Sequence, residues 1–132
     1  DGHQIIGRMA QDLPDNHHPS ELPTIMTPRL IELCFQTAGV WEMGIQGRMG
    51  LPRQIESVSS SLPGESRKID RLLYAIVTPD EHRGTFDADV IDSRGNRVVS
   101  LRGYRTVAIP NAVESEPMKA LRAAMSLEAV AV

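Results

Sequence analysis

The sequence predicts an α+β fold in which one antiparallel β-sheet wraps around a single long central helix. Three observations predict this fold: a proline-free apolar segment long enough for about four helical turns, several strand-like runs separated by turns, and the order of these segments along the chain. A helix that is apolar on nearly all sides must be buried. A curved sheet around such a helix buries it with few unpaired elements, and this arrangement is called the hot-dog fold.

The composition fits one folded domain and excludes several classes of function. The chain has 132 residues, of which 41% are hydrophobic and 23% charged, so wholesale disorder is excluded. A net charge of −3 and the lack of a Lys/Arg cluster exclude a strongly basic nucleic-acid binder. The single cysteine, Cys34, excludes a disulfide framework and multi-cysteine metal sites, and it favours a cytoplasmic location. No apolar run approaches the ~20 residues of a membrane span.

The N-terminal segment is expected to form one strand followed by a loop. Residues 4–10 have a strand-like sequence, and the turn-forming run 13–20 follows. The chain opens on Asp1 without a signal-peptide pattern and enters the strand almost at once. We therefore expect a fragment of a longer protein, or a processed product.

The central helix is predicted over residues 29–43, which contain no proline and are apolar on most sides. Thr27 is a suitable N-cap, and Pro28 is a suitable first helical residue because the first turn does not use the N–H that proline lacks. Gly44 and Gly47 supply the stop signals. We expect this helix to be buried, with the other elements around it.

The remaining segments predict the strands of the sheet. Their apolar spacing predicts strands over residues 49–59, 69–78, 85–92 and 97–109. The last two form an antiparallel hairpin, and period-two alternation places Phe86, Ala88 and Val90 on one face. The polar run 57–61 is most simply a loop.

The C-terminal segment is expected to be an amphipathic helix. Ser115 is a suitable N-cap, and apolar residues follow at helical spacing. The predicted organisation is therefore a hot-dog domain over residues 1–112 and a helical tail or linker over residues 113–132.

Two polar residues stand apart within the apolar helix. Glu32 and Gln36 are separated by one helical turn, so they share a face. A buried glutamate is costly unless it is paired or protonated, and a protonated carboxyl with a raised pKa suits a general acid. Gln36 would then orient that carboxyl or bind a substrate. The alternative is that both side chains simply face water where the helix meets a dimer edge.

The helix resembles the central helix of hot-dog-fold 3-hydroxyacyl dehydratases. Free-standing members carry a Glu-x-x-x-Gln-x-x-Gly pattern, which Glu32, Gln36 and Gly39 match. The C-terminal half of the double-hot-dog dehydratase domains of polyketide and polyunsaturated-fatty-acid synthases is more similar still. Its Pro-x-Leu-x-Asp-x-x-x-Gln/His motif is matched by Pro28, Leu30, Glu32 and Gln36, with Glu where the synthases have Asp.

The resemblance extends over residues 4–110. Residues 50–52 resemble the family's Leu-Pro strand after the helix, and residues 86–95 with 101–105 resemble its closing hairpin. It implies substrate-binding roles for four residues: Pro28, Gly39, Trp41 and Pro52. Trp41 either packs in the core or lines an acyl channel.

The resemblance implies a dehydratase half-domain that eliminates water from a 3-hydroxyacyl thioester. The substrate would be carried on the phosphopantetheine of an acyl carrier protein, and no metal or redox cofactor is implied. A histidine would take the α-proton while Glu32 donates a proton to the departing hydroxyl. The implied partners are the acyl carrier protein and either a neighbouring hot-dog half or a second copy of the chain, with no role for nucleic acid or membrane.

The source of the histidine is open. In the synthase domains it begins a His-x-x-x-Gly-x-x-x-x-Pro motif in the N-terminal half, and none of His3, His17, His18 and His82 begins that motif. We therefore expect the base to lie in an upstream half. The alternative is His18, which lies 14 residues before Glu32, the separation found in free-standing homodimers. His18 is otherwise an exposed loop histidine, and a metal pair of His17 and His18 lacks further ligands.

Two other functions remain alternatives to the dehydratase. The chain is a non-catalytic hot-dog scaffold or dimerisation half, or it is an acyl thioesterase, since related hot-dog thioesterases also place a carboxylate on this helix. Cys34 lies among apolar residues, which predicts core packing rather than a nucleophile. Asp87, Asp89 and Asp92 could suggest calcium, but the first two share an outward face and are better read as solvated.

Overall fold

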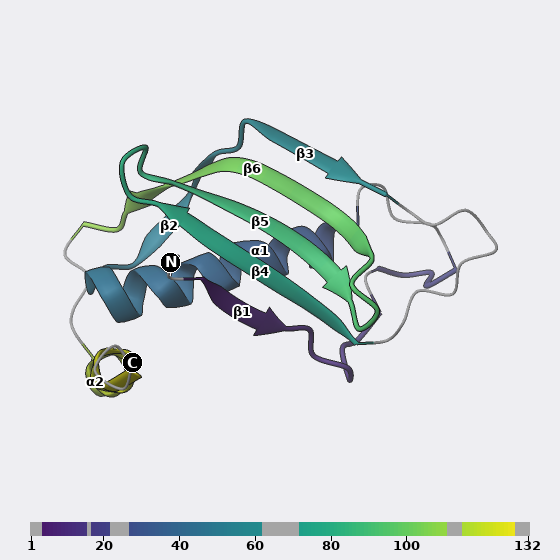
Figure 1. Ribbon diagram of the computed structural model, residues 1–132. Helices are drawn as coiled ribbons and strands as arrows, with labels where there is room; N and C mark the ends of the chain where they lie inside the picture. The colour runs from purple at the N-terminus through teal and green to yellow at the C-terminus, as the bar shows by residue number, and fades with distance from the viewer. Residues whose placement is uncertain (1–3, 16, 22–26, 62–71, 111–114, 129–132) are drawn as a thin grey trace.

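The structure is a computed structural model that describes residues 4–15, 17–21, 27–61, 72–110 and 115–128. Six antiparallel strands form one curved sheet, and a single long helix lies against its inner face (Figure 1). The predicted α+β hot-dog fold is therefore confirmed. Within the described residues, no helix is both long enough and apolar enough to cross a membrane.

The elements follow the predicted order. They are β1 (Ile5–Arg8), α1 (Pro28–Trp41), the π-helical turn η1 (Glu42–Gln46), β2 (Gly50–Gln54), β3 (Ser57–Ser60), β4 (Leu73–Asp80), β5 (Thr85–Asp92), β6 (Arg97–Ala108) and α2 (Glu116–Glu128). The strands lie in the order β1-β4-β5-β6-β2, and β3 also pairs with β6. The long strand β6 thus carries three neighbours, β5, β2 and β3.

The start of the central helix is confirmed, but its cap differs from the prediction. Pro28 is the first residue of α1, and Thr27 holds the N-cap position without a side-chain hydrogen bond to the helix. The helix does not stop at Gly44, because it continues as the five-residue π-helical turn η1. Gly47 ends that turn in the left-handed conformation that glycine adopts readily (φ 65°).

The predicted loop at residues 57–61 is wrong. Ser57–Ser60 forms β3, whose backbone pairs with residues 99–102 of β6. Val58 packs against the hydrophobic core. Backbone hydrogen bonds to β6 therefore hold this strand in the sheet. Its serine residues can make these bonds, but they lack the apolar side chains by which a strand is recognised in a sequence.

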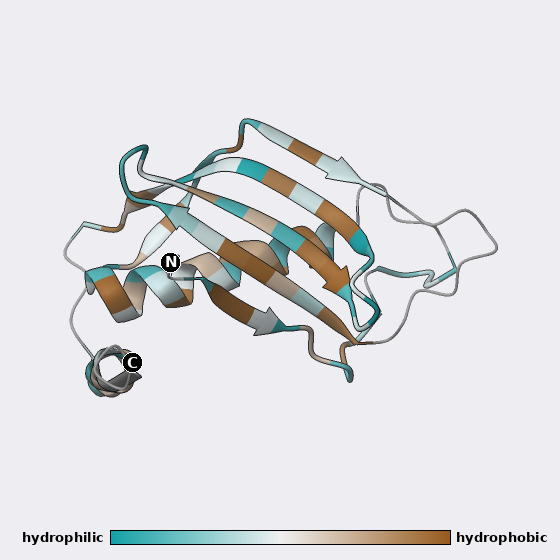
Figure 2. Ribbon diagram, in the orientation of Figure 1, coloured by the Kyte–Doolittle hydropathy of each residue, from teal (hydrophilic) through white to brown (hydrophobic). Residues whose placement is uncertain are grey.

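The hydrophobic core lies between α1 and the inner face of β4, β5 and β6. Hydrophobic and hydrophilic residues alternate along β5 (Figure 2), and Phe86, Ala88 and Val90 are buried on one face as predicted. Trp41 meets the ring of Phe86 edge-on, with the ring centroids 5.5 Å apart. The helix contributes five buried apolar side chains: Leu30, Leu33, Cys34, Ala38 and Trp41.

The central helix is not buried all round, which corrects the sequence prediction. Glu32, Gln36 and Val40 are exposed, and helical geometry places them in one line along α1. We call these three residues the open stripe. The sheet covers one side of α1, and no described element covers the open stripe, because a single sheet cannot close around the whole helix.

The predicted C-terminal helix is confirmed as α2, and it packs against η1. Met118 is buried, and Met125 contacts Gly44 closely enough that any side chain at position 44 would collide with its sulfur. The proposed division into a domain over 1–112 and a tail over 113–132 stays a prediction.

Candidate functional site

Glu32 and Gln36 form a hydrogen-bonded pair on the open stripe. The Gln36 side-chain nitrogen Nε2 donates to Glu32 Oε1 at 3.1 Å. Both side chains are exposed, so the predicted burial of Glu32 is wrong for the single chain. The hydrogen bond holds one carboxylate oxygen of Glu32 in place.

A shallow groove runs beside this pair, between β1 and α1. Its volume is about 210 Å³, and its lining residues are Ile5, Ile6, Gly7, Arg8, Leu33, Gln36, Thr37 and Val40. Small-molecule sites usually enclose ~300–1,000 Å³, so this groove is smaller than a complete site. The Thr37 hydroxyl donates to the Leu33 carbonyl (2.7 Å), which leaves the Gln36 amide as the polar side-chain group of α1 available to a ligand there.

Apolar side chains flank the groove. Ile6 is 64% exposed and Val40 is 36% exposed, although both are large hydrophobic residues. Exposed apolar surface of this kind next to a polar pair is typical of a surface that another protein unit covers.

The structure does not bring a described histidine to Glu32. His17 Nδ1 lies 2.8 Å from the carbonyl of Pro19, and His18 is exposed in the same loop. His82 is exposed in the turn between β4 and β5, and His3 lies outside the described residues. No histidine lines the groove in the part of the chain that the structure describes.

The other predicted site residues are not gathered into one cluster. Gly39 lies two turns after Glu32, and a Cβ built there meets nothing within 4 Å. Pro28 is exposed at the start of α1, and Pro52 is exposed on β2. Trp41 is 3% exposed and packs on Phe86, which favours the core-packing alternative over the channel-lining one.

Sequence reasoning missed a second carboxylate at the other end of the helix. Glu42 is fully buried in η1. Its Oε1 accepts hydrogen bonds from Arg48 Nη2 (2.6 Å) and from the hydroxyl of Thr106 (2.5 Å). Its Oε2 is buried and has no hydrogen-bond partner. The sequence carries no local signal for this cluster, because Thr106 is 64 residues away on β6 and only the sheet register places it there.

Tyr104 of β6 contacts the middle of the helix. Its ring stacks on Phe35 of α1, with the centroids 4.6 Å apart. Burial, assisted by the negative charges of Glu42 and Glu32, raises the pKa of the Tyr104 phenol to about 12. The phenol therefore stays protonated at neutral pH.

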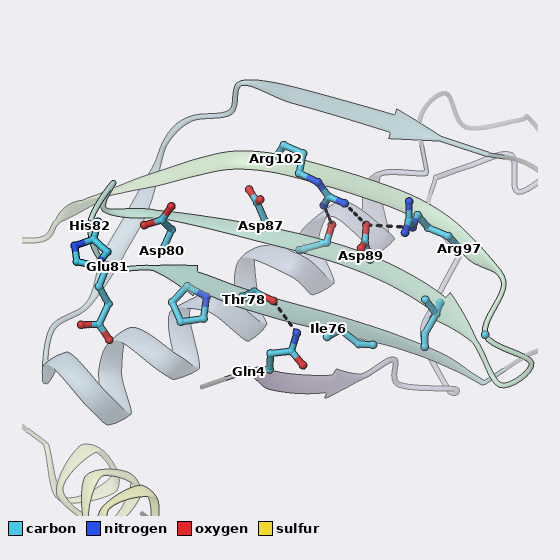
Figure 3. Close-up of a pocket in the computed structure, with 14 residues that line it drawn as sticks. Gln4, Ile76, Thr78, Asp80, Glu81, His82, Asp87, Asp89, Arg97 and Arg102 are labelled. Atoms are coloured by element: carbon cyan, nitrogen blue, oxygen red, sulfur yellow. Dashed lines mark hydrogen bonds and ion pairs between the residues drawn. The ribbon is translucent and has the colours of Figure 1, made fainter. Parts of the chain in front are cut away.

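A larger hollow of about 970 Å³ lies on the face of the sheet turned away from α1 (Figure 3). Three of its charged side chains, Asp89, Arg97 and Arg102, pair with one another. Asp89 accepts hydrogen bonds from Arg102 (2.9 Å) and Ser100 (2.8 Å) and lies 3.4 Å from Arg97. Asp87 accepts the backbone N–H of Gly103. Glu32 and Gln36 do not line this hollow, and we do not place the site here.

The described residues offer no metal centre. Among them, no group of three or more His, Cys, Asp and Glu side chains is arranged to hold a metal ion. Asp92, part of the calcium alternative, instead caps a turn by accepting hydrogen bonds from Arg94 and Asn96. The side-chain hydrogen bond from Asn96 holds the pKa of Asp92 below its usual value.

Comparison with known proteins gives one family. A family model described as the polyketide synthase dehydratase N-terminal domain matches residues 1–116, which include β1, the groove, α1 and the whole sheet. This match supports the dehydratase resemblance, but its description does not support the C-terminal half specifically. Comparison with curated proteins and with solved structures found no match.

Proposed function

The chain belongs to the polyketide synthase dehydratase family, and on that premise we propose that it is the acid-bearing hot-dog half of such a dehydratase. The whole enzyme would eliminate water from a 3-hydroxyacyl thioester carried on an acyl carrier protein. In the order of a double hot dog, the acid-bearing half is the C-terminal one. Two features support this assignment: the match of Pro28, Leu30, Glu32 and Gln36 to the motif of that half, and the absence of the family's histidine motif from the sequence.

The observation that carries the proposal is the Glu32–Gln36 pair beside an unfinished groove. The pair is hydrogen-bonded at 3.1 Å and stands on the side of α1 that the sheet leaves open. A second hot-dog unit laid on the open stripe would close the groove and cover Ile6 and Val40. It would also remove water from the carboxyl, and desolvation favours the neutral form that a general acid needs.

The proposed reaction uses two groups from two units. A histidine of the second unit takes the α-proton, and the electrons of that C–H bond form the new double bond. The bond between the β-carbon and the hydroxyl breaks, and the Glu32 carboxyl gives its proton to the departing oxygen, so water leaves. Gln36 holds the Glu32 oxygen through its amide and keeps the acidic proton directed into the groove.

The second unit is either a different hot-dog half or another copy of this chain. A different half would supply a histidine from its own motif. A second copy would supply His18, which is exposed in its loop and therefore accessible to a neighbouring chain. Replacement of His18 by Ala in the complete protein distinguishes the two arrangements. Activity is lost only if a second copy of this chain supplies the histidine.

The test is the product formed from a 3-hydroxyacyl thioester on an acyl carrier protein, followed by mass spectrometry. The assay uses the complete gene product that contains this chain, and it compares Glu32→Gln with Glu81→Gln. Glu81 is an exposed glutamate in the turn between β4 and β5, so its variant is a matched control. We expect the enoyl thioester from the wild type and from Glu81→Gln, and a loss of about 10²–10⁴-fold for Glu32→Gln, the usual contribution of a general acid.

Three outcomes would contradict the proposal. Full activity of Glu32→Gln would remove Glu32 from the mechanism. Release of a free acid and a thiol would assign a thioesterase. No turnover by the complete, folded protein would assign the scaffold alternative.

A further inference from the structure

Glu42 is a fully buried carboxylate at the point where α1 becomes the π-helical turn η1. π-Helical turns are rare and occur frequently at functional sites. A buried charge is tolerated only where it is paired and hydrogen-bonded. Arg48 and Thr106 supply this partnership at 2.6 Å and 2.5 Å. One carboxylate oxygen therefore ties the end of the central helix to β6.

The second oxygen of Glu42 is closely packed against β2. A Cβ at position 50 would collide with Glu42 Oε2 and would lie 2.8 Å from the Cβ of Thr106, so only glycine fits there. Three segments thus meet at one carboxylate: η1 through Glu42, β2 through Gly50, and β6 through Thr106. The backbone of Gly50 and the side chain of Thr106 take up the space, and the Glu42 side chain is fully buried among the described residues, out of reach of a substrate.

Directional contacts of this kind fix the rotation and the position of a helix, which apolar contacts leave adjustable. Against the sheet, the buried side chains of α1 outside this cluster are mainly apolar, and apolar burial has no preferred direction. Arg29, at the start of α1, bonds to the Pro14 carbonyl in the preceding loop and not to the sheet. A charge-assisted hydrogen bond has a defined distance and angle. Setting register is the best-attested use of buried polar groups. The Glu42 cluster is therefore suited to setting both the rotation of α1 about its axis and its position along the sheet.

We propose that Glu42 is a positioning residue for the dehydration: its bonds to Arg48 and Thr106 set the orientation of α1, and so the direction in which Gln36 faces the groove and holds Glu32 beside it. This inference rests on the proposed function of Glu32. Glu32 lies ten residues earlier on the same helix, ~15 Å along its axis. At that distance Glu42 touches no substrate at the groove and acts only through the position of the helix.

A contact in the middle of α1 supports the same link. Tyr104 of β6 stacks on Phe35 at 4.6 Å, directly before Gln36 in the sequence. The phenol lies within electrostatic reach of both Glu42 and Glu32. The strand that holds Glu42 through Thr106 therefore also contacts the helix beside the site residues.

The experiment separates position from stability with two pairs of variants in the complete gene product. Glu42→Leu replaces the carboxylate with an apolar group of similar volume, and Arg48 can then be solvated because its side chain is 44% exposed. Thr106→Val replaces the hydroxyl with a methyl group and so removes its hydrogen bonds with Glu42 and Arg48. Thr106→Ser keeps a hydroxyl donor and is the rescue variant. Thr78→Val, on the outer face of β4, is the matched control for the valine substitution.

We expect thermal unfolding temperatures close to that of the wild type for Glu42→Leu and Thr106→Val. Their kcat should fall by about 10- to 100-fold, the scale that small misplacements of reacting groups cause. KM should stay within about twofold of wild type, because α1 still presents the same groove residues to the thioester. Thr106→Ser should recover kcat to within about threefold of wild type, and Thr78→Val should match wild type.

Wild-type kcat in folded Thr106→Val overturns the inference, whether or not Glu42→Leu folds. A fall in kcat that tracks a lower unfolding temperature across all the variants also overturns it, since that is the pattern of a purely structural role. Failure of the proposed function looks different. In that case the wild type produces no enoyl thioester, or Glu32→Gln keeps full activity, whatever the Glu42 variants do.

Discussion

Glu32 and Glu42 lie on the same continuous helical segment, yet their environments are opposite. Glu32 is exposed and is held by the neutral amide of Gln36. Glu42 is fully buried and is held by the charge of Arg48. The difference follows from position: the sheet and α2 enclose the end of the helix, whereas the open stripe lies beside the edge strand β1 and is left uncovered by the described residues. The lesson is that the accessible carboxylate is the one suited to chemistry with a partner unit, and the enclosed one is suited to holding structure.

Replacement of Glu42 by Ala should give the largest effect on folding. The variant loses two hydrogen bonds and leaves a cavity where the carboxylate packed against Gly50, so we expect a destabilisation of about 2–5 kcal/mol. Urea denaturation of the 132-residue chain measures it. A loss below about 1 kcal/mol would mean that the cluster contributes little to the fold.

The second prediction compares how alanine at two glycine positions changes the free energy of unfolding. Gly50→Ala should lower the free energy of unfolding by about 1–3 kcal/mol, because its Cβ collides with Glu42 Oε2. Gly39→Ala should raise it by about 0.5–1 kcal/mol, because a helical glycine with open space around its Cβ gains from alanine. Equal effects at the two positions in urea denaturation would contradict the close packing described at Gly50.

A third prediction uses the pH dependence of stability. Burial raises the pKa of the Cys34 thiol from 9.0 to about 12, so above pH 9 the unfolded chain loses this proton before the folded one. Stability should therefore fall as the pH rises from 9 towards 12. Cys34 should account for a loss of about 1 kcal/mol in the free energy of unfolding at pH 10. Cys34→Val should reduce this slope in urea titrations at several pH values. An unchanged slope would show that the thiol is accessible to water.

The smallest expected effect belongs to Glu32→Gln in the chain alone. Its side chain is exposed and its partner is neutral, so the free energy of unfolding should change by less than about 0.5 kcal/mol. The same variant is expected to lose most of the dehydratase activity of the complete protein. A large loss of stability in the isolated chain would instead assign Glu32 a structural role like that of Glu42.

Local patterns predicted the parts of the fold that depend on local physics. Pro28 marks the start of α1 because proline is suited to a first helical turn, and the alternation around Phe86 identifies β5 because a half-buried strand has period two. The strand-like run over residues 49–59 is two strands, β2 and β3, and the loop interpretation of residues 57–61 was wrong because the pairing of Ser57–Ser60 depends on β6 rather than on its own side chains.

The candidate site was predicted in part, and the reason is geometric. Helical spacing correctly placed Glu32 and Gln36 on one face. It could not show which face the sheet covers, so the expected burial of Glu32 was wrong. Glu42 was missed for the complementary reason: its partner Thr106 is distant in the sequence, and only the register of β6 brings it to the helix end.

The docking of α2 has a practical consequence for anyone who shortens this protein. The family match ends at residue 116, where α2 begins, so a fragment trimmed to that boundary would lose Met118 and Met125. Removing them would leave Gly44 without its cover and would let water reach the turn that encloses Glu42. A recombinant fragment intended for biophysical work should therefore extend through residue 128 rather than stop where the family match ends.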